Sequence, residues 1–207
     1  RNYYLAVPEI IHYVLKKSRS PVFYQELIEK IWRPGVCAIP ELDEPKLNYL
    51  SEFRRLWSQL QSMWPEVRSE IANLLEYSGL SGTVFGSLKP DKARPDQTVR
   101  QIRVSSLVKQ MDQFISDEDP DLPLCNKFEN FTSAKIKLAT KKGHDPISHP
   151  FFDHCQNLVR TAEGLLNEMA TYWVYLKYKS LKFADIKLHE KKSQQNVLFF
   201  DDLLALV

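Results

Sequence analysis

The sequence contains little glycine, with 6 residues in 207, against 12 prolines. Sandwiches and barrels of β-strands need frequent tight turns, so this shortage argues against an all-β fold. Cysteine is scarce as well, and Cys37, Cys125 and Cys155 form no Cys-x-x-Cys pair. An odd number of cysteines is a poor framework for disulfide bonds, which favours a reducing cytoplasm. Nothing resembles a signal peptide, and no apolar run approaches the roughly 18 residues of a membrane span.

Motifs that hold phosphate groups are missing too. The sequence contains no Gly-x-x-x-x-Gly-Lys-Ser/Thr, and the spacing of Gly79, Gly82 and Gly86 does not match Gly-x-Gly-x-x-Gly. Three glycines spaced in this way are typical of a turn-rich connection. We therefore predict that this chain carries no catalytic site, binds no cofactor, and has no ATPase, helicase or nuclease activity of its own.

One histidine-rich stretch invites interpretation as a metal site. Histidines recur every five residues, with two aspartates and a cysteine beside them: His144, His149, His154, Asp145, Asp153 and Cys155. This spacing does not place the histidines on one helical face, and structural zinc sites usually show tighter ligand pairs. We predict that His149-Pro150 begins a helix and that no metal binds. An enzyme that uses the 144–155 segment is a remote alternative.

The spacing of apolar residues and prolines predicts an all-α fold, with under about a tenth of the residues in strands. We expect one multi-helix domain over residues 1–207. Its helices are predicted at about 8–18, 20–34, 46–63, 98–116 and 150–190, with short helical pieces over 124–142 and loops over 36–45 and 117–123. Pro65 either kinks the 46–63 helix or starts a new helix, and Ser78-Gly79 is the predicted end. The stretch 79–97 is rich in glycine and proline, and we expect 81–105 to form a flexible connection or arm.

The strongest element is the long C-terminal helix. Apolar residues alternate spacings of three and four over more than three heptads: Phe152, Cys155, Val159, Ala162, Leu166, Met169, Trp173 and Leu176. This pattern predicts a continuous seam that packs against other helices, the 46–78 segment being the expected neighbour.

Charge is clustered although the net charge is only +2. Bases outnumber acids over 89–109, 131–144 and 171–192, and aromatic residues lie at the start of the third cluster. Basic patches with nearby aromatics can follow a phosphate backbone, whereas a solvated helix face is the alternative for each cluster. The candidate DNA-binding residues are Arg94, Arg100, Arg103, Lys135, Lys137, Lys141 and Lys142.

The two ends suggest part of a longer protein. The sequence begins with Arg1 rather than methionine and ends in the apolar stretch Phe199–Val207. An apolar end normally continues into further structure, although a C-terminal helix docked on the domain is an alternative. We expect 198–207 to begin a return into a neighbouring domain.

The order of several motifs resembles a known family. Phe128-Glu129-Asn130-Phe131 precedes Lys141-Lys142-Gly143, His149-Pro150-Phe151-Phe152-Asp153, the long helix, a basic Glu190-Lys191-Lys192 and Phe200-Asp201-Asp202-Leu203-Leu204. Upstream, the stretches 64–70 and 74–79 fit the same pattern. This order resembles the RecB family, the beta subunits of exodeoxyribonuclease V, within the UvrD/Rep-like superfamily 1 helicases. The resemblance covers about 55–80 and 124–204, and Phe199 departs from it where family members often have a small residue.

The resemblance implies that the chain is the helical accessory subdomain called 1B, inserted in the first motor domain. The parent would be an ATP-dependent DNA helicase and nuclease of double-strand break repair and recombination that uses ATP and Mg²⁺. In that family the subdomain projects an arm toward double-stranded DNA and abuts the gamma subunit, RecC. The expected partners are double-stranded DNA and the RecC-like and RecD-like subunits of a heterotrimer. We expect no association with a membrane and a location in the cytoplasm. A helical module that binds only protein is the alternative.

Overall fold

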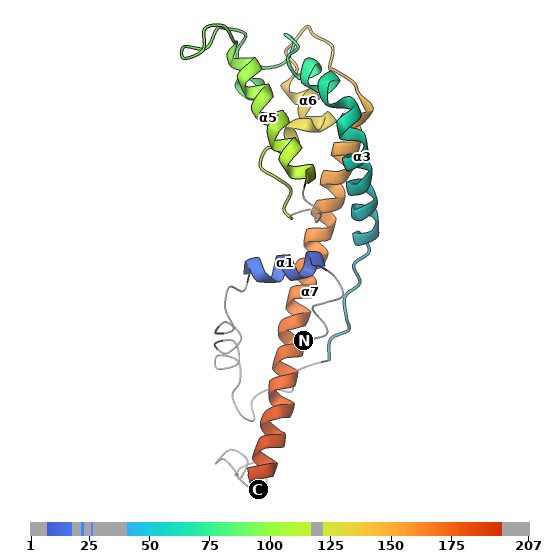
Figure 1. The fold of residues 1–207 in the computed structure, drawn as a ribbon. Helices are drawn as coiled ribbons and strands as arrows, with labels where there is room; N and C mark the ends of the chain where they lie inside the picture. Colours follow the sequence, from blue (N-terminus) through green and yellow to red (C-terminus); the bar gives the residue numbers. More distant parts are fainter. Residues whose placement is uncertain (1–7, 18–21, 23–25, 27–40, 117–121, 196–207) are drawn as a thin grey trace. The chain divides into compact units, whose positions relative to one another are not determined.

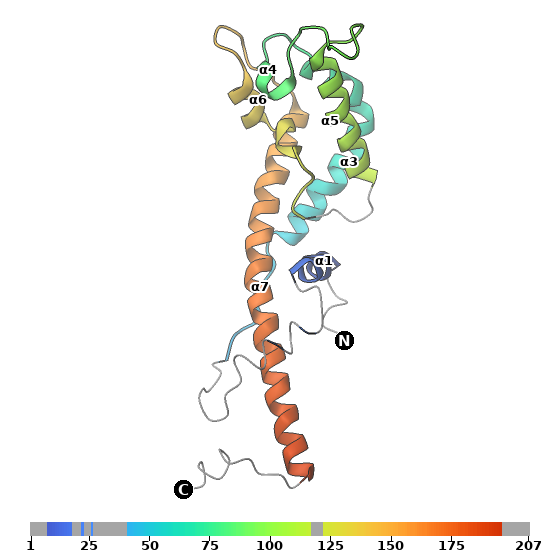
Figure 2. The same cartoon turned by 90° about the vertical axis from the view of Figure 1, so that its left-hand side faces the viewer.

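The computed structural model describes residues 8–17, 22, 26, 41–116 and 122–195. Its elements are α1 (Pro8–Lys17), α3 (Leu50–Leu75), α4 (Gly82–Phe85), α5 (Val99–Ser116), the 3-10 helix η1 (Phe128–Phe131), α6 (Ser133–Ala139) and α7 (Pro150–Gln195). The described residues contain no strand beyond two isolated bridges, so the all-α prediction is confirmed. Figures 1 and 2 show these helices from two sides.

The chain divides into two compact units, although the sequence predicts one domain. The central unit comprises residues 48–166, and the end unit comprises residues 1–47 and 167–207. Helix α7 contributes its first turns to the central unit and the remainder to the end unit. The predicted helix over 20–34, Cys37, the acidic turn at 117–121 and the predicted return over 198–207 lie outside the described residues, apart from Val22 and Glu26.

The long helix is confirmed: α7 runs without a break over 46 residues. Its start is formed by His149, as predicted. The Nδ1 atom of His149 accepts a hydrogen bond from the N–H of Phe151 at 3.1 Å, and its carbonyl accepts one from Phe152 at 3.0 Å. The imidazole therefore satisfies a backbone donor that the first turn of a helix leaves unpaired.

The buried face of α7 includes six of the eight residues of the predicted seam and differs from it at the other two. The predicted Val159 and Leu166 are only half-buried, whereas their neighbours Leu158 and Leu165 are fully buried. The fully buried row alternates spacings of four and three: Phe151, Cys155, Leu158, Ala162, Leu165, Met169, Tyr172 and Leu176. Both rows share every second residue, and apolar residues at both members of each adjacent pair fit either row. The sequence pattern therefore predicted the helix and most of its buried face, but it placed Val159 and Leu166 where Leu158 and Leu165 are more deeply buried.

Helix α3 is continuous through Pro65, so Pro65 does not start a new helix, which was one of the two alternatives that the sequence left open. Proline in a helix interior removes a hydrogen bond and costs about 3 kcal/mol or more. Burial on both sides of it offsets this cost, because Leu60, Trp64 and Ile71 are almost fully buried. The helix ends at Leu75, with Glu76 as its C-cap in a right-handed conformation. The prediction that Gly79 ends this helix is wrong, since the chain has already turned three residues earlier.

Aromatic rings from α3, α5, η1 and α7 form the core of the central unit. The Trp64 ring centroid lies 5.9 Å from that of Phe131 and 5.3 Å from that of Phe151. One to two turns earlier on α3, Trp57 meets Phe114 of α5 edge to face at 4.7 Å. Rings at these separations contribute about 0.5–1.5 kcal/mol per pair beyond the burial of their area. Because Trp64 lies on α3 and Phe151 on α7, their contact confirms the prediction that the 46–78 segment packs beside the long helix.

A polar bridge between α3 and α5 gives the first testable prediction. Asp112 accepts hydrogen bonds from the Trp64 indole N–H at 2.8 Å and from Arg68 at 2.8 and 2.7 Å. In Asp112→Ala the buried indole N–H loses its partner, and we expect the free energy of unfolding to fall by about 1–3 kcal/mol. Asp112→Asn retains an acceptor and should lose less. Urea unfolding followed by tryptophan fluorescence measures both, and equal losses would show that the indole bond contributes nothing.

The same bridge predicts a dependence on pH. Hydrogen bonds from Arg68, and then from Trp64, hold the pKa of Asp112 below its usual value. A carboxyl whose pKa is lowered by folding stabilises the protein above the pKa it has when unfolded, about 3.9, and loses this effect as the pH falls through its folded pKa. The stability difference between the natural protein and Asp112→Asn should therefore be present at pH 7 and shrink below about pH 4.

Candidate nucleic-acid interface

Arg100, a predicted DNA-binding residue, is buried in the central unit. Its side chain is 1% exposed, and its guanidinium donates to three backbone carbonyls. Nε donates to Gly86 at 3.1 Å, Nη2 to Leu80 at 2.7 Å, and Nη1 to Tyr77. Burial lowers the pKa of this guanidinium. The prediction that Arg100 contacts DNA is wrong, because the group is enclosed and its donors hold the chain together.

Arg100 thereby organises the segment that the sequence predicts to be a flexible connection. This segment forms the short helix α4, where the Ser81 side chain accepts the N–H of Thr83, and then a closed loop before α5. A bridge between Pro90 and Thr98 closes the loop, and Asp91 donates its N–H to Gln97 at 2.9 Å. The rest of the predicted connection, from Val99 onward, is the first part of α5.

The second basic cluster, over 131–144, is hydrogen-bonded to this segment although it lies about 60 residues later in the sequence. The N–H of Lys141 donates to Gly79 at 2.9 Å, and that of Ser81 donates to Ala139 at 2.7 Å. The Lys141 Nζ donates to the carbonyl of Ser78 at 2.7 Å. Figure 2 shows the result, with α4 and α6 side by side at one end of the central unit.

Arg103 reaches the same segment from α5. Its Nη1 donates to the carbonyls of Thr83 at 2.8 Å and Val84 at 3.2 Å, while the side chain is exposed. Two clusters that lie far apart in the sequence are thus brought to one backbone stretch, residues 78–84. We call the exposed bases attached there, Arg103, Lys141 and the adjacent Lys142, the basic surface.

The remaining candidates are less closely associated. Arg94 is exposed in the closed loop, where its backbone N–H donates to Asp91 Oδ1 at 3.1 Å. Lys135 is half-buried on α6 and pairs with Glu129 at 3.2 Å, which reduces the charge it offers to a phosphate. Lys137 is exposed on the same helix. No hydrogen bond or ion pair among the described residues joins the side chains of these three bases to the basic surface.

The third basic cluster lies on α7 in the end unit, where its lysines cover the aromatic rings of their own helix. Lysines lie over rings four residues earlier at 5.1–6.0 Å from the ring centroid: Lys177 over Trp173, Lys179 over Tyr175, Lys182 over Tyr178 and Lys187 over Phe183. Such cation–π pairs stabilise an exposed helix. Because the rings already have cations beside them, this arrangement favours the solvated helix face over a platform on which bases stack.

The histidines and cysteines take up separate structural contacts. His144 lies 3.4 Å from the Tyr77 hydroxyl, His149 starts α7, and the Nε2 of His154 lies 2.8 Å from the carbonyl of Leu56. Within the described parts of the chain, no three His, Cys, Asp or Glu side chains gather closely enough to hold a metal ion. Burial raises the pKa of the Cys125 thiol to about 11 and also raises the pKa of the Cys155 thiol well above its usual value. Thiols of this kind are inert at neutral pH.

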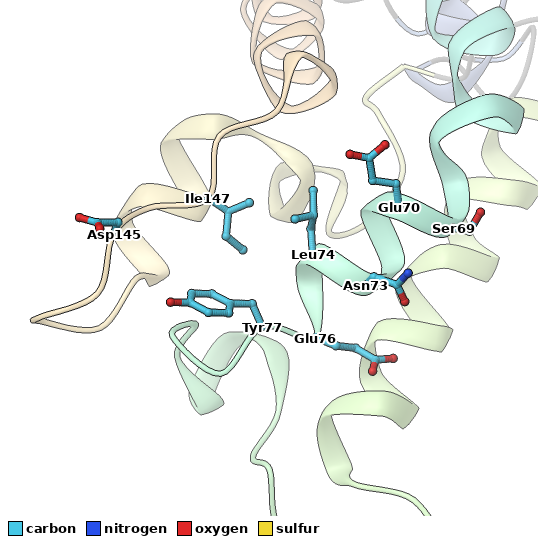
Figure 3. Close-up of a pocket in the computed structure, with 8 residues that line it drawn as sticks. All are labelled: Ser69, Glu70, Asn73, Leu74, Glu76, Tyr77, Asp145 and Ile147. Carbon is cyan, nitrogen blue, oxygen red and sulfur yellow. The ribbon is translucent and has the colours of Figure 1, made fainter.

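A groove beside the basic surface has the opposite charge. It lies between the end of α3 and the loop before α7, has a volume of about 790 Å³, and is lined chiefly by Glu70, Leu74, Glu76, Tyr77, Asp145 and Ile147. Figure 3 shows Leu74, Tyr77 and Ile147 together in the middle, with Asp145 on one flank and Glu70 and Glu76 on the other. The sequence did not reveal this groove, because its two sides are about 70 residues apart and no motif marks either one.

Comparison with models of known protein families finds no match to this sequence, and a search of curated proteins finds no significant match. None of the helices that the structure describes combines the length and the hydrophobicity needed to cross a membrane.

Proposed function

We propose that this chain is a non-catalytic accessory domain of a RecB-like, ATP-dependent DNA helicase and nuclease. In this proposal it contacts double-stranded DNA and RecC-like and RecD-like subunits during cytoplasmic double-strand break repair. ATP and Mg²⁺ act elsewhere in the parent protein. The family part of the proposal rests on the sequence resemblance, which includes the Phe128–Phe131, Lys141–Gly143 and His149–Asp153 motifs.

The observation that carries the DNA-binding part is the basic surface. Arg103 and Lys141 come from separate sequence clusters, yet both bond to backbone carbonyls between residues 78 and 84. Their partners are neutral carbonyl groups, so these hydrogen bonds hold the cations in place without cancelling their charge. A group of fixed cations attracts a phosphate backbone regardless of base sequence.

The test is the salt dependence of duplex binding by Lys141→Glu combined with Lys142→Glu in the full-length protein. Each lost phosphate contact should make the slope of log K against log salt shallower by about 0.9, and affinity at about 0.1 M salt should fall roughly tenfold or more. Fluorescence anisotropy with duplexes of several sequences measures both quantities. The loss should be equal for all sequences, because contacts to phosphate do not read bases.

A matched control is Lys16→Glu combined with Lys17→Glu, since these residues are also an adjacent exposed pair but lie in α1. It changes the net charge by the same amount and should leave the slope unchanged. An unchanged slope in the Lys141 and Lys142 variant, or an equal change in the control, would favour the module that binds only protein.

That second candidate function has an observation of its own in its favour. The acidic groove adjoins the basic surface and cannot attract phosphate, because its rim carries Glu70, Glu76 and Asp145. A surface of this kind is suited to a protein partner. Both functions are compatible in one accessory domain.

A further inference from the structure

We propose that the acidic groove binds a basic segment of a partner protein, with an arginine or lysine side chain lying over the Tyr77 ring. The proposal extends the partner-binding part of the proposed function, but it rests on the groove alone and its test uses no DNA. The groove lies entirely within the central unit.

The floor of the groove suits the aliphatic part of a long basic side chain. Leu74 and Ile147 are half-buried, and Tyr77 is 41% exposed, so apolar surface is open to a ligand. Arginine and lysine pack their methylene groups along apolar surface while their charged ends remain near water. The face of a tyrosine ring attracts such a charged end, and guanidinium groups stack on it particularly well.

The rim determines the sign of the ligand's charge. Glu70, Glu76 and Asp145 surround the floor from both sides, and none of the residues lining the groove is a lysine or arginine. The Glu70 side chain is 62% exposed, so its carboxylate is accessible from outside although His149 Nε2 lies 3.5 Å from it. Three carboxylates around an apolar floor attract cations and repel phosphate or an acidic peptide. The complementary partner is therefore a peptide with both basic and apolar side chains.

Contacts within the central unit hold the Tyr77 ring of the floor in position. Gly79 lets the Tyr77 ring lie against the backbone, since a Cβ at this position would be 2.3 Å from Tyr77 Cε1 and 3.0 Å from His144 Nδ1. The Tyr77 hydroxyl lies 3.4 Å from the same His144 atom, and Arg100 holds the Tyr77 carbonyl. A ring fixed in this way loses little conformational freedom on binding, which favours affinity.

The experiment measures fluorescence anisotropy of two labelled peptides with the full-length protein, one Ala-Leu-Arg-Arg-Leu-Ala and the other Ala-Leu-Glu-Glu-Leu-Ala. We expect the basic peptide to bind and the acidic peptide not to bind. Glu76→Lys combined with Asp145→Lys should weaken binding of the basic peptide about tenfold, because two attractive rim charges become repulsive. Tyr77→Leu, which removes the aromatic face and keeps the apolar volume, should weaken it several-fold.

The matched control is Glu66→Lys combined with Glu163→Lys, two exposed carboxylates outside the groove that give the same change in net charge. This variant should bind the basic peptide like the natural protein. Equal binding of both peptides, equal losses in the control, or no binding of the basic peptide would overturn the proposal. Self-association that the groove variant abolishes would also overturn it, because the occupant would then be a second copy of the chain. Loss of duplex binding alone bears on the basic surface and leaves this proposal intact.

Discussion

Replacing Arg100 by methionine is expected to lower the free energy of unfolding by about 3–5 kcal/mol. Methionine keeps an unbranched apolar stem but supplies no donor. The carbonyls of Leu80 and Gly86 would then be left without a donor, whereas the Tyr77 carbonyl would keep the N–H of Leu80 at 3.2 Å. Each buried carbonyl without a donor costs about 1–3 kcal/mol, and relief from burying a charge offsets part of the sum. Chemical unfolding monitored by circular dichroism measures the loss.

Arg103 is the matched control for this prediction. It lies three residues further along α5 and also bonds to two carbonyls, but its side chain is exposed and water can replace it. Arg103→Met should therefore cost under about 1 kcal/mol. Arg100→Lys should fall between the two, because an ammonium cannot reproduce the planar fork of donors. Equal stability of Arg100→Met and Arg103→Met would contradict the role assigned to Arg100.

Gly86→Ala is expected to be the second large effect, with a loss of about 2–5 kcal/mol in the free energy of unfolding. Gly86 has φ +90° and ψ 157°, a conformation that residues with a Cβ rarely adopt. An added Cβ would also lie 2.8 Å from the carbonyl oxygen of Val99 and 2.9 Å from backbone atoms of Arg100. Both contacts are with backbone, so relief requires the loop and the start of α5 to move apart.

Gly143→Ala serves as a control that measures the cost of the backbone conformation without a steric clash. Gly143 has a similar φ of +81°, but an added Cβ would meet nothing within 4 Å. Its substitution should cost only the left-handed backbone penalty of about 1–2 kcal/mol. The difference between the two variants, measured by thermal unfolding, reports the close approach at Gly86. A Gly86→Ala variant as stable as Gly143→Ala would show that the loop is free to yield.

Both predictions address the connection over 79–97, where reasoning from sequence was least informative. Its glycines and prolines predict turns, which the structure contains, but they do not show which residues hold the turns together. The hydrogen bonds come from Arg100 and Arg103, which lie on the following helix, and from the 139–141 segment. An arginine within a basic cluster is expected to be exposed to solvent. The burial of Arg100 was therefore not predictable without knowing that three backbone carbonyls would accept its hydrogen bonds.

Some features of the candidate site were also visible in the sequence, and others were not. The basic clusters over 89–109 and 131–144 are visible in the sequence, because charge density is a local property. This clustering could not separate the enclosed Arg100 from the exposed Arg103 three residues later, although one is structural and the other is available to a ligand. The acidic groove was missed entirely, since Tyr77 and Asp145 meet only when the chain folds.

The class of fold and the long helix were both predictable from the sequence. Apolar spacing of three and four, a histidine and proline at the start, and scarce glycine are local features whose helical consequence does not depend on neighbours. Packing against other helices was needed to choose between adjacent apolar residues such as Leu158 and Val159, because both fit the helical spacing. The fold likewise decided between the two alternatives at Pro65, which lies inside one continuous helix, and it placed Arg100 inside the unit. In each case packing and hydrogen bonds from distant segments outweighed the local preference.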